Sequence, residues 1–123
     1  MDAFKILFVD DEIDFLETLM KRMKKRGVGV SGVGSGENAL KFLDDKPADV
    51  VVLDVKMPGM DGIEVLKIFK KAYPEMAVIM LTGHGSEKAA KEGIEFGAFD
   101  YLTKPCELED LIEKIHEAIA KGR

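Results

Sequence analysis

An uninterrupted apolar run, Val-Val-Val-Leu at residues 50–53, is the segment that most constrains how this chain can fold. Its residues do not alternate between apolar and polar, as they would in a strand with one face in water. Short apolar runs rich in β-branched residues are typical of strands that are buried on both faces, which occur in the middle of parallel sheets. The run stops abruptly at Asp54. We therefore expect a central parallel strand that ends in a carboxylate.

The rest of the chain alternates between strand and helix patterns, five of each. A parallel sheet needs this order, because every strand must be joined to the next by a crossover that is usually a helix. We expect a doubly wound α/β fold with right-handed crossovers and a single domain over residues 1–123. The expected strands are residues 4–9, 28–33, 50–53, 77–81 and 99–102; the expected helices are residues 12–26, one capped by Ser35, and residues 61–72, 86–96 and 107–121.

Composition excludes several classes of function. The net charge of −5 argues against direct binding of nucleic acid by this domain. No apolar run approaches the ~18 residues of a membrane span, and the N-terminus has no signal-peptide pattern. The single cysteine, Cys106, cannot form an internal disulfide, which favours a reducing cytoplasm. We expect a cytoplasmic protein without membrane contact.

Polar residues stand where the expected strands end. The carboxyl ends of parallel strands meet at one edge of the sheet, where ligands of such folds bind. The residues at these ends are Asp10, Asp11, Asp54, Thr82 and Lys104. Three carboxylates, a hydroxyl and an amine would then share a small space. Each has an ordinary alternative: Asp11 can cap the following helix, Thr82 can form a turn, and Lys104 can be a solvated surface lysine.

The combination predicts phosphoryl chemistry. Crowded carboxylates repel one another, and Mg²⁺ relieves that repulsion because it prefers a few carboxylates together with waters and phosphate oxygens. Asp54 would be the nucleophile that accepts a phosphoryl group. The Lys104 ammonium and the Thr82 hydroxyl would stabilise the phosphoryl oxygens.

The motifs that carry these residues resemble the receiver domain of two-component response regulators over essentially the whole chain. They are residues 8–12 (FVDDE), 53–62 (LDVKMPGMDG), 81–83 (LTG) and 99–105 (FDYLTKP). The resemblance implies a flavodoxin-like fold with strand order 2-1-3-4-5. It implies Asp54 as the phosphorylation site and Asp10 and Asp11 as metal carboxylates, with the Lys56 backbone carbonyl as a further ligand. It also implies a cis peptide bond at Pro105.

A signalling switch also follows from the resemblance. Thr82 would turn toward the phosphoryl group, and Tyr101 would then turn inward; Tyr101 can equally be an ordinary half-buried strand aromatic. The helix at residues 86–96 contains Gly93 and has a thin apolar stripe, which suits an element that moves. The resemblance implies a sensor histidine kinase or phosphotransfer protein as the donor. An output domain or downstream protein would bind residues 86–121, and a phosphorylation-dependent homodimer is a further option.

Two other functions fit these motifs less well. A hydrolase that turns over an aspartyl phosphate would use a second acid two residues after the nucleophile, where this chain has Lys56. A flavin-binding module would need a glycine- and hydroxyl-rich phosphate loop after the first strand, where this chain has residues 10–14 (DDEID). The sequence therefore favours a domain that catalyses only its own phosphorylation and dephosphorylation. The resemblance implies that side chains at Lys56 and His84 tune the lifetime of the phosphoryl group, although a solvated loop residue is the better explanation of His84.

Overall fold

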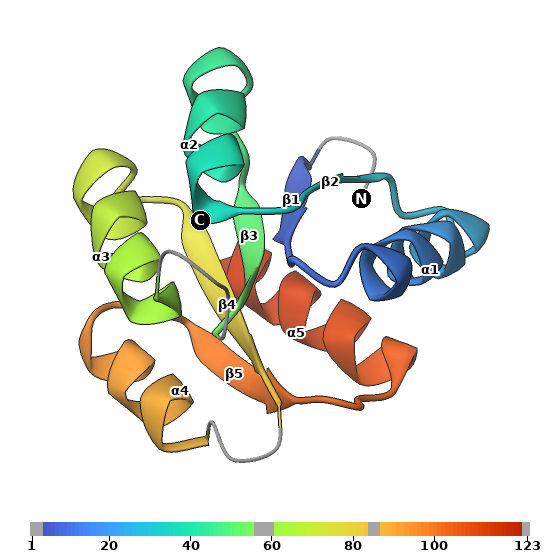
Figure 1. Cartoon of the computed structure of the whole chain (residues 1–123). Helices are drawn as coiled ribbons and strands as arrows, with labels where there is room; N and C mark the ends of the chain where they lie inside the picture. Colours follow the sequence, from blue (N-terminus) through green and yellow to red (C-terminus); the bar gives the residue numbers. More distant parts are fainter. Residues whose placement is uncertain (1–3, 56–60, 84–86, 122–123) are drawn as a thin grey trace.

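The computed structural model describes residues 4–55, 61–83 and 87–121. In these residues, five strands alternate with five helices (Figure 1). The elements in chain order are β1 (Ile6–Val9), α1 (Ile13–Lys25), β2 (Val30–Val33), α2 (Gly36–Asp45), β3 (Val50–Asp54), α3 (Gly62–Ala72), β4 (Ala77–Thr82), α4 (Glu87–Glu95), β5 (Asp100–Thr103) and α5 (Leu108–Lys121).

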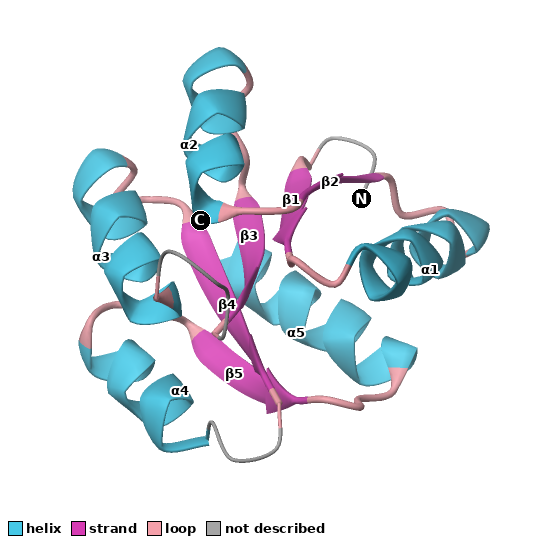
Figure 2. Cartoon of the chain, in the orientation of Figure 1, coloured by secondary structure: helices cyan, strands magenta, loops and turns pink. Residues whose placement is uncertain are grey.

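The strands form one parallel sheet in the order β2-β1-β3-β4-β5. The expected flavodoxin-like fold is thus confirmed, strand order included. All strands run the same way, so their carboxyl ends share one edge, which lies toward the bottom of Figure 2. The strand order reverses between β1 and β3, and ligands of open α/β sheets bind outside the carboxyl ends near such a point.

Two apolar cores cover the two faces of the sheet. Alternate residues of β3 enter opposite cores: Val51 and Leu53 pack with α2, α3 and α4, and Val50 and Val52 pack with α1 and α5. Figure 1 shows the same division of helices between the two faces. Every residue of β3 is buried, as its continuous apolar run predicts.

β1 and β2 are shorter than the sequence predicts, and β5 is displaced by one residue. β1 begins at Ile6 because the Lys5 amide donates to the Asp49 carboxylate at 2.8 Å instead of joining the sheet ladder. β2 begins at Val30, two residues late, and its residues are only partly buried at the sheet edge. β5 begins and ends one residue later than expected, at Asp100 and Thr103, and has the expected length.

The helix starts confirm the expected cap at Ser35 and exclude one of the two roles left open for Asp11. The Ser35 hydroxyl accepts a hydrogen bond from the Asn38 amide at 3.1 Å, so Ser35 caps α2 as predicted. Asp11 does not cap α1: the N-cap is Glu12, which makes no capping hydrogen bond through its side chain among the described residues. The Asp10 carboxylate instead accepts a hydrogen bond from the backbone amide of Glu12 at 2.9 Å, so an acid before the helix provides an acceptor for the amide of the N-cap residue.

The apolar stripe of α4 is narrower than predicted. Ala90 and Gly93 are buried against the sheet, but the Ile94 side chain is 42% exposed. α4 therefore packs on the sheet through the small residues Ala90 and Gly93.

Candidate functional site

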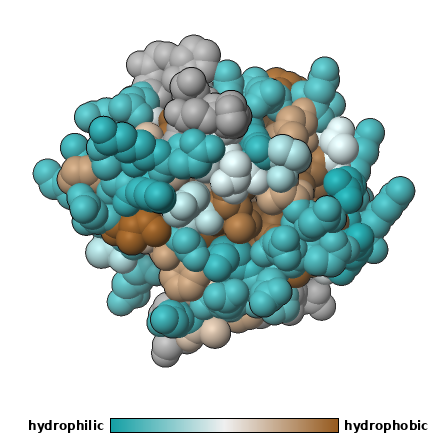
Figure 3. Space-filling model, turned by 90° about the horizontal axis from the view of Figure 1, so that it is seen from below, coloured by the Kyte–Doolittle hydropathy of each residue, from teal (hydrophilic) through white to brown (hydrophobic). Residues whose placement is uncertain are grey.

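The candidate site lies at the carboxyl edge of the sheet. Asp10 directly follows β1, Asp54 is the last residue of β3, Thr82 is the last residue of β4, and Lys104 directly follows β5. Figure 3 shows the molecule from this side: most of the surface is hydrophilic, with hydrophobic surface visible near the centre. Asp10 and Asp54 are only 3% and 4% exposed, and Thr82 is fully buried. Burial of carboxylates to this degree requires charged or polar partners.

The Lys104 ammonium is the main charge partner of these carboxylates. Its Nζ atom lies 2.8 Å from Asp10 Oδ2, 3.1 Å from Glu12 Oε1 and 3.8 Å from Asp54 Oδ1. The amine also lies 4.3 Å above the centre of the Phe15 ring. Lys104 is thus a central residue of the site and not a solvated surface lysine, its side chain being 14% exposed.

Two opposing effects set the pKa of Lys104. Burial disfavours the ammonium and lowers the pKa. The hydrogen bond to Asp10, the charges of Asp10 and Asp54, and the hydrogen bond to Glu12 raise it and outweigh burial, so the pKa lies above its ordinary value. The amine therefore carries a full positive charge at neutral pH, as a group that stabilises anionic oxygens must.

Three carboxylates come close enough to share a cation. Oxygens of Asp10, Glu12 and Asp54 all lie within 4.8 Å of one another. All the donors are hard oxygens, so the set suits Mg²⁺ better than a transition metal. Asp11 is not a member of this group in the described part of the chain.

Glu12 is the site residue that the sequence reasoning missed. Its signal was present in the acidic run of residues 10–12, but only its contact with Lys104 distinguishes it from an exposed helix-start acid.

Thr82 and Tyr101 face the side of the sheet that carries α4. Side chains alternate along a strand, so Thr82 follows Val78 and Met80 toward the core of α2, α3 and α4. Tyr101 is the register partner of Met80 and packs, half-buried, against the same core. The Thr82 hydroxyl donates to the Gly83 carbonyl at 3.2 Å. Asp54 pairs in register with Leu81, which belongs to the opposite core.

The segment after β5 returns Lys104 to this edge. The Lys104 amide donates to the Thr82 carbonyl at 2.7 Å, which continues the pairing of β4 with β5 by one residue. The next peptide bond, Lys104–Pro105, is cis.

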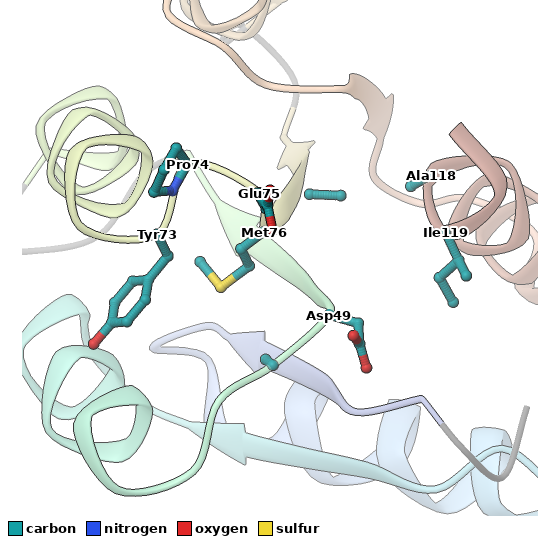
Figure 4. Close-up of a pocket in the computed structure, with 9 residues that line it drawn as sticks. Asp49, Tyr73, Pro74, Glu75, Met76, Ala118 and Ile119 are labelled. Atoms are coloured by element: carbon teal, nitrogen blue, oxygen red, sulfur yellow. The ribbon is translucent and has the colours of Figure 1, made fainter. Parts of the chain in front are cut away.

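One surface pocket lies away from this cluster. A pocket of about 480 Å³ is lined by the segment before β3, the turn after α3 and the end of α5, at the amino ends of the strands (Figure 4). Asp49, Met76 and Ile119 are among its lining residues. The acidic cluster therefore does not line this pocket and lies at the opposite edge of the sheet.

Comparison with known proteins places this arrangement in a family. The family model of the response regulator receiver domain matches residues 6–116. The chain belongs to the response regulator receiver domain family. Receiver domains of this family are part of two-component systems, and the sequence-based identification is confirmed.

Curated relatives of this receiver domain are longer proteins. A putative NtrX-like response regulator from Rickettsia bellii is 37% identical over 91% of this chain and 24% of its own length. The uncharacterized transcriptional regulatory protein YesN of Bacillus subtilis is 36% identical over 96% of this chain and 33% of its own length. The receiver domain thus spans between about a quarter and a third of the relatives it matches.

Solved receiver domains have the same fold. A response regulator receiver domain protein from Clostridium thermocellum has a TM-score of 0.91 and 37% identity, covering 97% of this chain and 96% of its own. The receiver domain of NtrX from Brucella abortus has a TM-score of 0.88 and 32% identity, covering 94% of this chain and 98% of its own.

Some expectations for the receiver domain stay predictions. Lys56 and His84 lie outside the described residues. Asp11 is half-buried beside the cluster, and its role as a metal ligand remains a prediction. Among the described residues, no helix has the length and apolar character needed to cross a membrane.

Proposed function

We propose that Asp54 accepts a phosphoryl group from a phosphohistidine of a sensor histidine kinase or phosphotransfer protein. The observation that carries this proposal is the pairing of a buried carboxylate at the end of β3 with a second buried carboxylate and an ammonium 3.8 Å away. A carboxylate is a sufficient nucleophile once ionised, so the site needs no general base.

The transfer is an in-line displacement. An oxygen of Asp54 forms a bond to phosphorus as the bond between phosphorus and the histidine nitrogen breaks, and the electron pair stays on that nitrogen, which then takes a proton. Lys104 moves from its carboxylate partners toward the phosphoryl oxygens, and the Thr82 hydroxyl leaves the Gly83 carbonyl to donate to one of them. Both groups offset charge that develops during transfer.

Mg²⁺ supplies charge neutralisation of the phosphoryl oxygens when it is bound. Asp10, Asp11 and Asp54 would hold it, together with the backbone carbonyl of Lys56. The donor set supports this assignment, since Asp10 and Asp54 bring buried carboxylate oxygens within 4.8 Å of each other.

The domain acts as a switch and catalyses only its own phosphorylation and dephosphorylation. When Thr82 turns to the phosphoryl group, it vacates space on the α4 side of the sheet, and Tyr101 moves into it. The surface of α4, β5 and α5, within residues 86–121, then changes its affinity for an output domain, a downstream protein or a second copy of the domain. Support comes from Tyr101 and Ala90, which pack in one core, and from the alternation along β4, which directs Thr82 to the same side of the sheet.

Intact-mass measurement after incubation with acetyl phosphate and Mg²⁺ tests the proposal. The wild-type domain should gain the mass of one phosphoryl group in an adduct that is lost in base, and Asp54→Asn should gain none. Asp45→Asn, which removes an exposed acid at the end of α2, is the matched control and should still be modified. Absence of an adduct on the wild type with metal present would overturn the proposal.

A further inference from the structure

The Lys104 amine contacts two residues at the start of α1, the N-cap Glu12 and Phe15 in the first turn. Its nitrogen lies 3.1 Å from Glu12 Oε1 and 4.3 Å above the centre of the Phe15 ring. Glu12 is the N-cap of α1 and Phe15 lies in its first turn, and both side chains contact the same amine. Carboxylate and ring face are both groups that attract an ammonium.

The Lys104 amine lies closer to Asp10 and Glu12 than to the proposed phosphoacceptor Asp54. Nζ makes hydrogen bonds to Asp10 at 2.8 Å and to Glu12 at 3.1 Å, whereas Asp54 Oδ1 lies at 3.8 Å, beyond hydrogen-bonding distance. Asp10 stays close to Asp54 and would remain near Lys104 in any arrangement of the site. Glu12 at the N-cap of α1 and Phe15 in its first turn contact Lys104 from outside the pair of buried acids, so they bias its position.

Glu12 and Phe15 differ in solvent exposure. The Glu12 side chain is 65% exposed at the mouth of the site, while Phe15 is half-buried against the core of α1 and α5. An exposed carboxylate contributes little to folding through an ion pair. Removing the charge of Glu12 should therefore leave the fold intact and change the position of the Lys104 amine.

We propose that Glu12 and Phe15 are positioning residues that hold Lys104 in a parked state, and that this state competes with engagement of the phosphoryl group on Asp54. This inference rests on the proposed function of Asp54. A parked state reduces the apparent affinity for a phosphoryl group, because only the fraction of molecules with Lys104 released is competent to bind it. The identities of residues 12 and 15 would then set how readily this domain is phosphorylated.

The position of Lys104 can be followed directly by NMR of the lysine ε-methylene groups, with the Lys104→Arg variant used for assignment. Protons above an aromatic ring are shifted upfield, so the Lys104 signal should be upfield in the free protein. It should move toward the ordinary lysine position in Glu12→Gln, in Phe15→Leu and on addition of Mg²⁺ with beryllofluoride. Lys67, which lies 4.3 Å over the Phe96 ring, is an internal reference that Glu12→Gln should not move.

Affinity for beryllofluoride at saturating Mg²⁺ gives the second readout. Glu12→Gln should bind the phosphoryl analogue at least about threefold more tightly than wild type. Glu17→Gln, which removes the same charge from an exposed position further along α1, should bind like wild type. Mg²⁺ affinity, measured separately by calorimetry, separates an effect on the cation from an effect on Lys104.

The outcomes distinguish the two proposals. If wild type fails to bind beryllofluoride, the proposed function of Asp54 fails. If wild type binds but Glu12→Gln binds equally or more weakly at saturating Mg²⁺, the parked state is overturned while the function of Asp54 stands. An unshifted Lys104 signal in the free wild-type protein also overturns the parked state. If Phe15→Leu does not fold, Glu12→Gln still decides the matter.

Discussion

The first residue of α3, Gly62, lies directly against the backbone of Val55. The Gly62 amide donates to the Val55 carbonyl at 3.1 Å, and a Cβ atom on residue 62 would overlap that same carbonyl oxygen. Val55 directly follows the proposed phosphoacceptor Asp54. The start of α3 is thus fixed against the end of β3, one residue from the site.

Gly62→Ala should destabilise the protein. Alanine is the better helix former by about 1 kcal/mol, but overpacking against a backbone atom that cannot rotate away costs about 1–3 kcal/mol. We expect the steric cost to prevail and the free energy of unfolding to fall, as measured by urea denaturation. An unchanged or higher midpoint would show that β3 and α3 can separate freely.

Gly93→Ala should have the opposite sign. A Cβ atom at this position of α4 would lie 3.4 Å from Leu66 and 3.5 Å from Met80, which is ordinary contact. The gain in helix propensity then remains, so the free energy of unfolding should rise by roughly 0.5–1 kcal/mol. The same urea titration measures it, and a loss of stability would mean that α4 packs more tightly on the sheet than the structure shows.

Lys104→Met should destabilise the metal-free domain. The substitution leaves the buried carboxylates of Asp10 and Asp54 without their ammonium, which costs about 3 kcal/mol for a buried charge. Lys114→Met is the control, because its partner Asp100 is 36% exposed and a pair of this kind contributes under about 1 kcal/mol. Equal losses in the two variants would contradict a buried charge network at the site.

Magnesium should stabilise the folded domain, and more so in Lys104→Met, where no ammonium competes with the cation. A ligand at a hundred times its dissociation constant contributes about 2.7 kcal/mol. Thermal melts with Mg²⁺ and with a chelator measure the effect. Asp54→Asn should reduce it, and a shift that survives this substitution unchanged would place the cation elsewhere.

Acid should selectively remove the contribution of Asp100. Burial opposes its ionised form, but hydrogen bonds from Lys114 and from the Tyr101 amide prevail and hold the pKa of this carboxyl below its ordinary value. A lowered pKa stabilises the fold above the unfolded value of about 3.9 and loses that effect as the pH falls below it.

The comparison is between wild type and Asp100→Asn. The two should differ in unfolding free energy by under about 1 kcal/mol at neutral pH, since Asp100 is partly solvated. The difference should shrink toward zero below pH about 4. A difference that stays constant with pH would mean that the carboxylate charge contributes nothing.

Much of the fold follows from the sequence because periodicity and burial are local signals. The apolar run before Asp54 predicts a central strand, and Ser35 predicts the start of α2; both are confirmed. The first residues of β1, β2 and β5 are harder to predict from the sequence. For β1, the contact of the Asp49 carboxylate with the Lys5 amide joins residues that are distant in sequence.

Some residues of the site could likewise be predicted from the sequence, and one could not. Strand ends predict that Asp10, Asp54 and Lys104 meet, because parallel strands bring their carboxyl ends to one edge. The partnership of Glu12 with Lys104 could not be predicted, because an exposed acid at a helix start has many equivalent side-chain positions. Among the described residues, the position of the Glu12 side chain is fixed only by Lys104, which the chain brings to this edge directly after β5.

The alternation of side chains in β4 has a consequence for how this chain can vary. Thr82 faces one core and Leu81 the other, so the deletion of one residue within β4 would exchange their orientations and turn the Thr82 hydroxyl toward α1 and α5. Exchanges of one apolar residue of β4 for another keep these orientations and should leave the site intact. A one-residue insertion or deletion within β4 should therefore harm the site more than one in the connection before this strand.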